Sequence, residues 1–263
     1  MCITNKVMDR EGLVISNQAL TSRLYEMVVS VDDIPGQVRG GQFVHVQIPG
    51  MEGHMLRRPF SVYYVDTQAS TLGILYQVVG FGSKRFAELK PGEKVQVMGP
   101  IGHGWSVPSG VKNALLTVGG VGAAPLFMHA AELVAAGVNV DVVMGAQTKE
   151  VLVAKQRYQD LLGFEPFIAT DDGSYGHAGF VTDVVLDRLA NNQYDYAACC
   201  GPAPMMRIVS EKTLAAKVPS FVSLEQHMAC GIGACLGCIV STTEGNRRSC
   251  VDGPVFDASK VVW

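Results

Sequence analysis

The stretch ALLTVGGVGAAP, residues 114–125, decides the fold class of this chain. Its first five residues form an apolar run that is typical of a strand buried on both faces of a sheet. A glycine-rich turn follows and a helical pattern begins at Pro125, so the segment is predicted to pass from a strand into a helix. Free backbone N–H groups at such a turn can cradle the pyrophosphate of a dinucleotide. The glycines of this turn are Gly119, Gly120 and Gly122.

The same alternation of strand and helix continues on the C-terminal side of this turn. Apolar strands that alternate with helices predict a parallel sheet covered by helices on both faces. This α/β domain is predicted to span residues 109–220. The predicted strands are 114–118, 138–144, 167–170 and 196–200, and the predicted helices are 125–136, 153–162, 179–189 and 204–217.

The last of these strands runs into CGPAPMM, residues 200–206, at the carboxyl edge of the predicted sheet. Ligands bind at that edge in open α/β sheets, so Cys200, Gly201 and Pro202 are candidate contacts. Without a ligand, the same segment is a helix-opening turn followed by methionine packing. The first turn lacks the full G-x-G-x-x-G fingerprint, and Asp141 lies near the start of its strand. An ordinary Rossmann dehydrogenase is therefore disfavoured.

The N-terminal part of the chain carries the signals of antiparallel β-structure. Short strand patterns alternate with turn-forming Pro-Gly pairs, which predicts a sandwich or a small barrel over residues 1–108. One helix is predicted at 83–89, with Ser83 as its N-cap. The predicted strands are 25–31, 42–48, 61–65, 71–79 and 94–98.

Two short motifs in this first domain favour a flavin. RPFS, residues 58–61, lies between two predicted strands and offers a guanidinium for a phosphate, an aromatic ring for stacking and a hydroxyl for the flavin edge. GFGS, residues 80–83, precedes the predicted helix, so its free N–H groups can face a pyrophosphate. The alternative is a hairpin with an exposed arginine and a capped helix. The two motifs together, in this order, favour the flavin.

Four of the seven cysteines form the pattern C-x4-C-x2-C-x11-C near the C-terminus. This is the plant-ferredoxin spacing for a [2Fe–2S] cluster, and the glycines between the cysteines let the loop approach inorganic sulfide closely. Zinc is a weaker alternative because zinc sites favour two CxxC-like pairs, and reduced structural cysteines are a third. The segment 221–263 is too small for an apolar core of its own, so it needs a bound metal centre to stabilise its fold. The candidate ligands are Cys230, Cys235, Cys238 and Cys250.

Composition excludes several classes of protein. The chain has 263 residues with 21 Lys and Arg against 24 Asp and Glu, so its net charge of −3 excludes a broadly basic nucleic-acid binder. Its longest apolar runs fall far short of the roughly 20 residues that span a bilayer. The first twelve residues carry charges and no apolar core, unlike a secretory signal, so a cytoplasmic location is predicted.

Together the motifs resemble the ferredoxin–NADP reductase superfamily. R-x-[YF]-S, G-x-G-[ST], GGxGxxP and CGPxxMM occur in the order of that family. SLEQHMACGIGACLGC, residues 223–238, and CVDGPVF, residues 250–256, narrow the resemblance to the electron-transfer subunits of dihydroorotate dehydrogenase B. One departure is Phe60, where many reductases carry tyrosine. The resemblance implies a mixed β and α/β fold: an antiparallel β-barrel, a nucleotide-binding α/β domain with a parallel sheet, and a small C-terminal [2Fe–2S] segment.

The resemblance also implies three cofactors: FAD, NAD and a [2Fe–2S] cluster. The stretch 145–149 lacks arginine, which favours NAD over its phosphorylated form. No catalytic residue is assigned, although Cys200 is expected near the nicotinamide, and Glu225 could contact the flavin edge or cap a turn. The expected FAD contacts are Arg58, Pro59, Phe60, Ser61, Leu75, Tyr76, Gln77, Gly82 and Ser83, and the expected NAD contacts are Gly119, Gly120, Gly122, Cys200, Gly201 and Pro202.

The function that this resemblance implies is an electron relay in pyrimidine (UMP) synthesis. Dihydroorotate would be oxidised at FMN on a separate catalytic subunit, in a heterotetramer with two copies of each chain. Electrons would reach NAD+ through the [2Fe–2S] cluster and FAD. Two alternatives stay open: a reductase subunit with another partner, of the sulfide dehydrogenase or hydrogenase type, and a zinc-stapled binding module that retains an inactive reductase fold. No nucleic acid and no membrane is expected as a partner.

Overall fold

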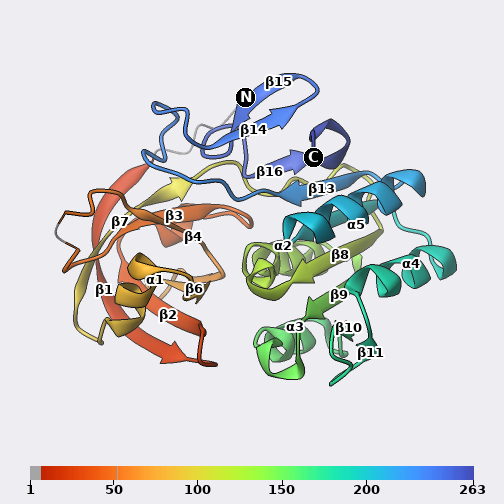
Figure 1. Cartoon of the computed structure of the whole chain (residues 1–263), viewed down its shortest axis with the longest axis horizontal. Coiled ribbons are helices and arrows are strands. Elements are labelled where there is room, and N and C mark those ends of the chain that lie inside the picture. Colours follow the sequence, from red (N-terminus) through yellow and green to blue (C-terminus); the bar gives the residue numbers. More distant parts are fainter. Residues whose placement is uncertain (1–6, 52) are drawn as a thin grey trace.

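A computed structural model of the chain describes residues 7–51 and 53–263. Within these residues it contains two seven-stranded sheets and one two-stranded sheet (Figure 1). The first sheet forms the N-terminal domain and the second forms the α/β domain beside it. The C-terminal segment, blue in Figure 1, lies across one end of both domains. No helix in the described part of the chain is long and apolar enough to cross a membrane.

The N-terminal domain is a curled antiparallel sheet with strand order β4-β3-β7-β1-β2-β6-β5, as the alternating strand patterns predicted. Alternate side chains such as Val29 and Val44 are fully buried and fill its interior. The helix α1 (Phe81–Glu88) packs on this core through the buried Phe86. The strands are β1 (Met8–Ala19), β2 (Leu24–Val31), β3 (Phe43–Gln47), β4 (Arg58–Ser61), β5 (Tyr64–Asp66), β6 (Thr71–Gln77) and β7 (Lys94–Ile101).

Two sequence predictions in this domain are wrong. RPFS does not lie between strands but is itself β4, and the single predicted strand 61–65 is interrupted at Val62 and Tyr63. The backbone N–H of Val62 bonds to Gln42 O (3.1 Å) and that of Tyr63 to Gly73 O (2.8 Å), so the chain changes partners between β4 and β5.

The first helix also begins earlier than predicted. It starts at Phe81 with Gly80 as N-cap, and Ser83 is its third residue rather than the N-cap. The Ser83 hydroxyl accepts the backbone N–H groups of Val79 (2.9 Å) and Gly80 (3.1 Å). Ser83 therefore stabilises the turn before the helix and leaves the N–H groups of Phe81 and Gly82 without a partner inside the helix.

The α/β domain confirms the prediction of a parallel sheet covered on both faces. The helices α2 (Ala123–Ala135) and α3 (Lys155–Leu162) cover one face, and α4 (Val181–Asn191) and α5 (Ala203–Ala215) cover the other. The strand order is β11-β10-β9-β8-β12-β13-β16. The strands are β8 (Asn113–Gly119), β9 (Asn139–Ala146), β10 (Phe167–Thr170), β11 (His177–Ala178), β12 (Tyr196–Cys200), β13 (Ser220–Ser223) and β16 (Val255–Asp257).

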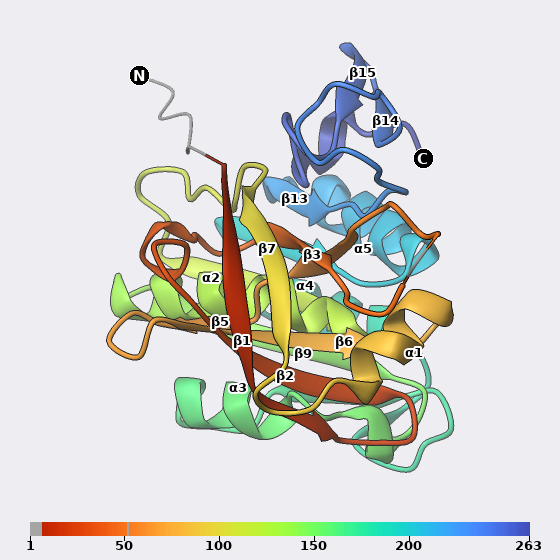
Figure 2. The ribbon, with the colours of Figure 1, turned by 90° about the vertical axis from the view of Figure 1, so that its left-hand side faces the viewer.

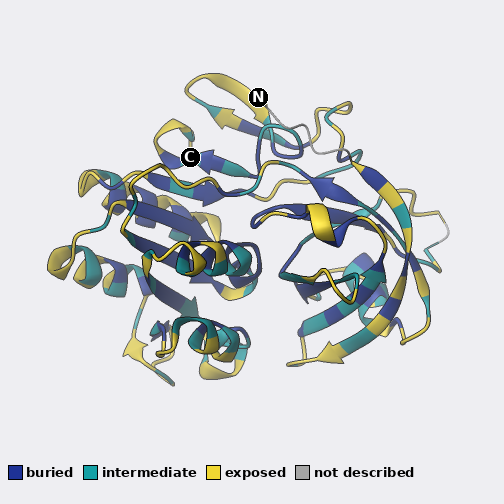
Figure 3. Cartoon of the chain, turned by 180° about the vertical axis from the view of Figure 1, so that it is seen from behind, coloured by how far each residue is buried: buried dark blue, intermediate teal, exposed yellow. Residues whose placement is uncertain are grey.

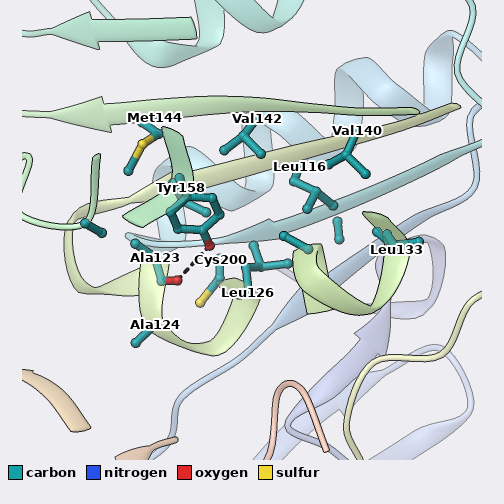
Figure 4. Packing of buried hydrophobic residues seen from close by; sticks show 14 of the residues in the cluster. Leu116, Ala123, Ala124, Leu126, Leu133, Val140, Val142, Met144, Tyr158 and Cys200 are labelled. Carbon is teal, nitrogen blue, oxygen red and sulfur yellow. Dashed lines mark hydrogen bonds between the residues drawn. The ribbon is translucent and has the colours of Figure 1, made fainter. Parts of the chain in front are cut away.

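The two faces of this sheet bury different side chains of the same strands. Figure 4 shows the face under α2 and α3, where the Tyr158 hydroxyl donates to the Ala123 carbonyl at 2.8 Å. Cys200 lies in this layer, whereas the neighbouring Cys199 lies in the layer under α4 and α5. This alternation follows from the two-residue period of a strand.

The C-terminal segment is inserted between two neighbouring strands of the second sheet. β13 and β16 pair antiparallel, with Ser223 opposite Val255. The chain between them carries the hairpin of β14 (Ile239–Thr242) and β15 (Gly245–Arg248). Figure 3 shows this hairpin largely exposed, in contrast to the buried strands of the parallel sheet. The cysteine part of the segment instead packs on the barrel, where Cys238 and Cys250 contact Phe43 and Ile101.

Direct contacts join the barrel to the α/β domain. The Trp105 indole N–H donates to the Pro125 carbonyl (2.7 Å), and its ring stacks on His129 of α2. The carboxylate of Glu132, on the same helix, accepts the Gly40 N–H at 3.2 Å. Figure 2 shows α2 running behind β1 and β7 of the barrel. These contacts fix α2, and with it the glycine turn before α2, against the barrel.

Candidate functional site

A corner whose side chain and N–H groups suit an anion lies where β4 meets the start of α1. The side chain of Arg58 crosses Gly82 so closely that a Cβ at that position would lie 2.5 Å from Arg58 Nε. The N–H groups of Phe81 and Gly82 and the positive end of the helix dipole lie at the same corner. A guanidinium beside free N–H groups suits a diphosphate. These residues therefore fit the pyrophosphate of FAD, and Ser83 supports the turn rather than offering its hydroxyl.

The aromatic residue of RPFS packs into the barrel. The Phe60 ring stacks on Phe86 with centroids 4.5 Å apart and lies edge-on to Tyr76. Phe86 thus covers one face of the Phe60 ring. Stacking of the flavin on the remaining surface of this ring stays a prediction. The Tyr76 hydroxyl donates to Asn17 Oδ1 (2.8 Å), and burial raises the pKa of this phenol.

The three expected cofactor contacts on β6 separate onto two faces. Tyr76 belongs to the barrel core, whereas Leu75 belongs to the apolar layer that includes α2. Gln77, two residues after Leu75, lines the cleft between the two domains. Pro59 and Ser61, on β4, lie opposite His45 and Phe43 of β3. The predicted FAD contacts of β4 and β6 therefore point to different faces of their strands and do not form one surface.

A cleft of about 650 Å³ opens between the barrel and the carboxyl edge of the parallel sheet. It brings together Gly119 and Gly120 from the first turn, Pro202 from the CGPAPMM turn, and Gln77 from the barrel. A cleft at this edge is where α/β sheets bind dinucleotides.

The two turns at this edge pack backbone against backbone. A Cβ at Gly122 would lie 2.4 Å from the Cys200 carbonyl oxygen, and one at Gly201 would lie 3.0 Å from Gly119 Cα. These glycines therefore allow the turns to meet, which the motif alone did not reveal. Cys200 itself is buried, its thiol lies 3.8 Å from the Ser223 carbonyl, and burial raises its pKa. Its position near a nicotinamide stays a prediction.

Other cleft residues were missed from the sequence. Gln147 follows β9 and Asp171 follows β10, so both lie at the edge that carries Gly119, and strand ends could have predicted them. On the barrel side, the cleft is lined by Gln77 and also by the turn between β1 and β2 with the first residue of β2, which carry no motif. The turn and the start of β2 contribute Thr21, Ser22, Arg23 and Leu24.

Glu225, just after β13, lies close enough to Cys200 for its charge to affect the pKa of that thiol. Its side chain reaches solvent, yet the protein packed around it raises the pKa of its carboxyl. After burial, the charge of Glu225 is the next cause that raises the pKa of Cys200. The structure thus places Glu225 near the carboxyl edge of the sheet, and its contact with a flavin stays a prediction.

The four predicted metal ligands lie in one loop region, and backbone N–H groups point at their sulfurs. Cys238 Sγ and Cys250 Sγ are 3.3 Å apart. Cys230 Sγ accepts the N–H groups of Ile232 (3.5 Å) and Cys235 (3.4 Å). Burial acts to raise the pKa of Cys230, but the N–H groups outweigh burial and lower this pKa to about 6. The N–H groups thus favour the thiolate form of Cys230, whereas burial raises the pKa of Cys250 to about 12.

The donor set of four cysteines fits an iron–sulfur cluster. In the described chain, no three Cys, His, Asp or Glu side chains gather closely enough to hold one metal ion. The sulfurs lie as two pairs, which suits a cluster with two cysteines on each of two irons. Cys199 and Cys200 are free thiols buried in the sheet, and Cys2 lies outside the described residues.

Two family models match the chain. The model described as "Iron-sulfur cluster binding domain of dihydroorotate dehydrogenase B" matches residues 225–262. The model described as "Oxidoreductase FAD-binding domain" matches residues 18–105. The matched ranges contain the four clustered cysteines and the Arg58 corner, respectively.

Curated relatives match along almost the whole chain. The "Dihydroorotate dehydrogenase B (NAD(+)), electron transfer subunit" of Geobacillus sp. (strain WCH70) is 36% identical over 254 residues, which are 95% of this chain and 96% of the relative. The protein of the same name from Desulforamulus reducens is 35% identical over 263 residues, 98% of this chain and 99% of the relative.

Solved structures share the fold. A chain of the NADH-dependent reduced ferredoxin-NADP oxidoreductase superposes with a TM-score of 0.86 at 28% identity, over 96% of this chain and 90% of that one. A ferredoxin NADP+ reductase from Neisseria gonorrhoeae, with bound FAD and NADP, has a TM-score of 0.67 at 17% identity, over 80% and 92% of the two chains. This second likeness concerns the fold alone. From its full-length relatives and its matched domains, the chain belongs to the family of electron-transfer subunits of dihydroorotate dehydrogenase B.

Proposed function

We propose that this chain is the electron-transfer subunit of an NAD+-dependent dihydroorotate dehydrogenase in pyrimidine synthesis. One observation carries the proposal: a single chain joins a four-cysteine cluster loop, an arginine corner that fits a diphosphate, and a dinucleotide cleft. Dihydroorotate loses two electrons and two protons on a separate subunit, and NAD+ takes up both electrons and one proton. FAD, when bound, exchanges single electrons on one side and hydride on the other.

The proposal gives each region of the chain its own task. Residues 1–108 hold FAD, with Arg58 and the start of α1 at its phosphates. Residues 109–220 hold NAD, and the glycine turns let the pyrophosphate approach the backbone. Residues 221–263 hold the [2Fe–2S] cluster through Cys230, Cys235, Cys238 and Cys250. Arg58, not Ser83, is the side chain that we expect to bind phosphate directly.

The partner that we propose is the FMN-containing catalytic subunit, in a cytoplasmic heterotetramer with two copies of each chain. The cluster loop supports a partner contact because it is exposed and carries two apolar side chains. Ile232 is 58% exposed and Leu236 is 61% exposed. Free cysteines throughout the described residues agree with a reducing compartment.

Reconstitution tests this function. The chain is purified anaerobically with and without a co-expressed FMN-containing dihydroorotate dehydrogenase, and NADH formation from dihydroorotate is followed by absorbance. We expect iron, labile sulfide and FAD in the chain and NADH formation only by the pair. NADH formation from dihydroorotate by the chain alone, or its absence with the pair, would contradict the proposal. Coupling to another electron donor instead would favour a reductase of the sulfide dehydrogenase or hydrogenase type.

Replacement of Arg58 tests the FAD corner. Arg58→Ala removes the guanidinium at the start of α1, so FAD affinity is expected to fall by about 10- to 100-fold, the value of a charge-assisted hydrogen bond. Flavin content and fluorescence titration measure the loss. The control is Arg10→Ala, which removes an exposed guanidinium that pairs with Asp33 and donates to the Asp9 carbonyl, away from the start of α1. Unchanged FAD affinity in Arg58→Ala would place the phosphates elsewhere.

A further inference from the structure

His45 is a fully buried histidine whose ring has no hydrogen-bond partner. Its exposed fraction is 0%, and neither Nδ1 nor Nε2 finds a donor or an acceptor among the described residues. Buried polar groups in native proteins nearly always have a partner. An imidazole without a partner among the described residues therefore indicates a group that the described chain does not supply.

The ring faces the cluster loop. Along β3, Val44 and Val46 point into the barrel core, so Phe43 and His45 point to the opposite face. Phe43 packs with Cys238 and Cys250 on that face. A Cβ at Gly231 would lie 2.9 Å from His45 Cε1 and 3.0 Å from its Nδ1. The imidazole thus abuts the residue that follows Cys230.

The other side of His45 is the strand of the proposed flavin corner. His45 lies opposite Pro59 in the pairing of β3 with β4. Met98 of β7, the partner of His45 in the other direction, also reaches Gly231. His45 is therefore the polar side chain at the point where the cluster loop rests on the RPFS strand.

The charge around the ring favours a neutral imidazole. Burial, and after it the positive charge of Arg57, lowers the pKa of His45 to about 4. A neutral imidazole carries one N–H donor and one acceptor. Arg57 itself is held by Asp9 in a bidentate pair at 2.9 and 2.7 Å, so it is not free to serve as the partner of the ring.

We propose that His45 is a positioning residue that donates its ring N–H to the iron–sulfur cluster held in the Cys230 loop and thereby raises the reduction potential of that cluster. A hydrogen bond to the sulfur of a cluster stabilises the reduced state, which carries the larger negative charge. This inference rests on the cluster of the proposed function. It adds a polypeptide contact from the barrel that the four cysteines do not supply.

Matched variants of the holoprotein test the proposal. His45→Leu removes the N–H, His45→Asn returns a donor at the place of Nδ1, and His45→Gln returns one at the place of Nε2. The cluster potential is measured by titration monitored by electron paramagnetic resonance. We expect His45→Leu to shift the equilibrium between oxidised and reduced cluster about tenfold toward the oxidised form, which is about 59 mV for one electron. In the Asn or the Gln variant, most of the wild-type potential is expected to be restored.

A spectroscopic measurement on the wild-type protein does not depend on whether the His45 variants fold. Pulsed electron paramagnetic resonance of wild-type protein labelled with ¹⁵N-histidine is expected to show a histidine nitrogen coupled to the reduced cluster. His227 lies in the cluster segment, so His227→Gln is the control, and the coupling must persist in it. Absence of coupling, or an unchanged potential in cluster-loaded His45→Leu, overturns the inference. Absence of iron and sulfide in wild-type protein would instead overturn the proposed function.

Discussion

The parallel sheet of the α/β domain and the cluster segment are stabilised in opposite ways. The strands β8 and β12 are buried between two apolar layers of helices. The cluster segment has small apolar contacts, with the barrel through Cys238 and Cys250 and with the sheet layer through Val240, and most of its loop is exposed. The sheet thus holds its shape through burial, while the segment depends on its ends, its cysteines and what they bind. Damage to one region should therefore leave the other intact.

Loss of a cluster ligand is the largest expected effect. Cys238→Ser replaces a buried thiolate ligand, so dihydroorotate-dependent NAD+ reduction by the complex should fall by more than about 100-fold, beyond the loss typical of outer-shell changes. Circular dichroism and FAD content should change little, because neither sheet needs this sulfur. The control is Cys199→Ala in the sheet core, which should retain iron. Full activity in a Cys238→Ser complex would show that electron transfer does not need this ligand.

A larger residue in the glycine turn should have the opposite effect: it should destabilise the parallel sheet and leave the cluster in place. Gly122→Ala adds a Cβ 2.4 Å from the Cys200 carbonyl, so the two turns must separate. We expect a loss of about 1–3 kcal/mol in the free energy of unfolding, the usual cost of overpacking, and weaker NAD binding. Urea unfolding and nucleotide titration measure both, and iron content should stay unchanged. Gly36→Ala is the matched control, since nothing lies within 4 Å of its Cβ. Equal stability of the two variants would show that the turns do not depend on their close approach.

A smaller effect is expected where the barrel meets α2. Burial acts to raise the pKa of Glu132, but the His129 ring, whose Nδ1 lies 3.5 Å from the carboxylate, and the hydrogen bond from the Gly40 N–H outweigh burial and lower this pKa below its ordinary value of 4.5. The folded pKa is lower than the unfolded one, so this carboxylate stabilises the protein above pH about 4.5 and less as the pH falls through its folded pKa.

Glu132→Gln should flatten this acid-side loss. Because the carboxylate is half exposed, the difference should stay under about 1 kcal/mol. Urea unfolding at a series of pH values from neutral downward measures it. Glu211→Gln, which removes an exposed carboxylate paired with Arg207 on α5, is the control. The same pH dependence in Glu132→Gln and wild type would show that this contact does not join the domains.

The parallel sheet and its helices could be predicted from sequence because their signal is local. Each apolar run from Ala114 to Cys200 is a buried strand, and each glycine turn lies at its carboxyl end. The four cysteines are likewise close in sequence: three lie in one loop, and Cys250 follows the hairpin of β14 and β15. The N-cap error at Ser83 arose because Gly80 in an extended conformation begins the helix without a side-chain signal.

Contacts between distant segments left no such signal. The pairing of β13 with β16 joins strands that are separated by the whole cluster segment. The turn at Thr21 reaches the nucleotide cleft only because the barrel is docked on α2. His45 in the sequence is one residue of an alternating strand. Its orphaned ring becomes visible only when the C-terminal segment covers β3.

The cluster segment is an insertion between β13 and β16, so it can be removed or transferred without changing the order of the sheet strands. Ser223 and Val255 are opposite each other in the sheet, so the two ends of the insertion are only about 5 Å apart. A short reverse turn could bridge that gap and yield a plain flavin reductase. By the same geometry, the loop could be spliced into other reductases of this fold that have an antiparallel strand pair at the corresponding sheet edge.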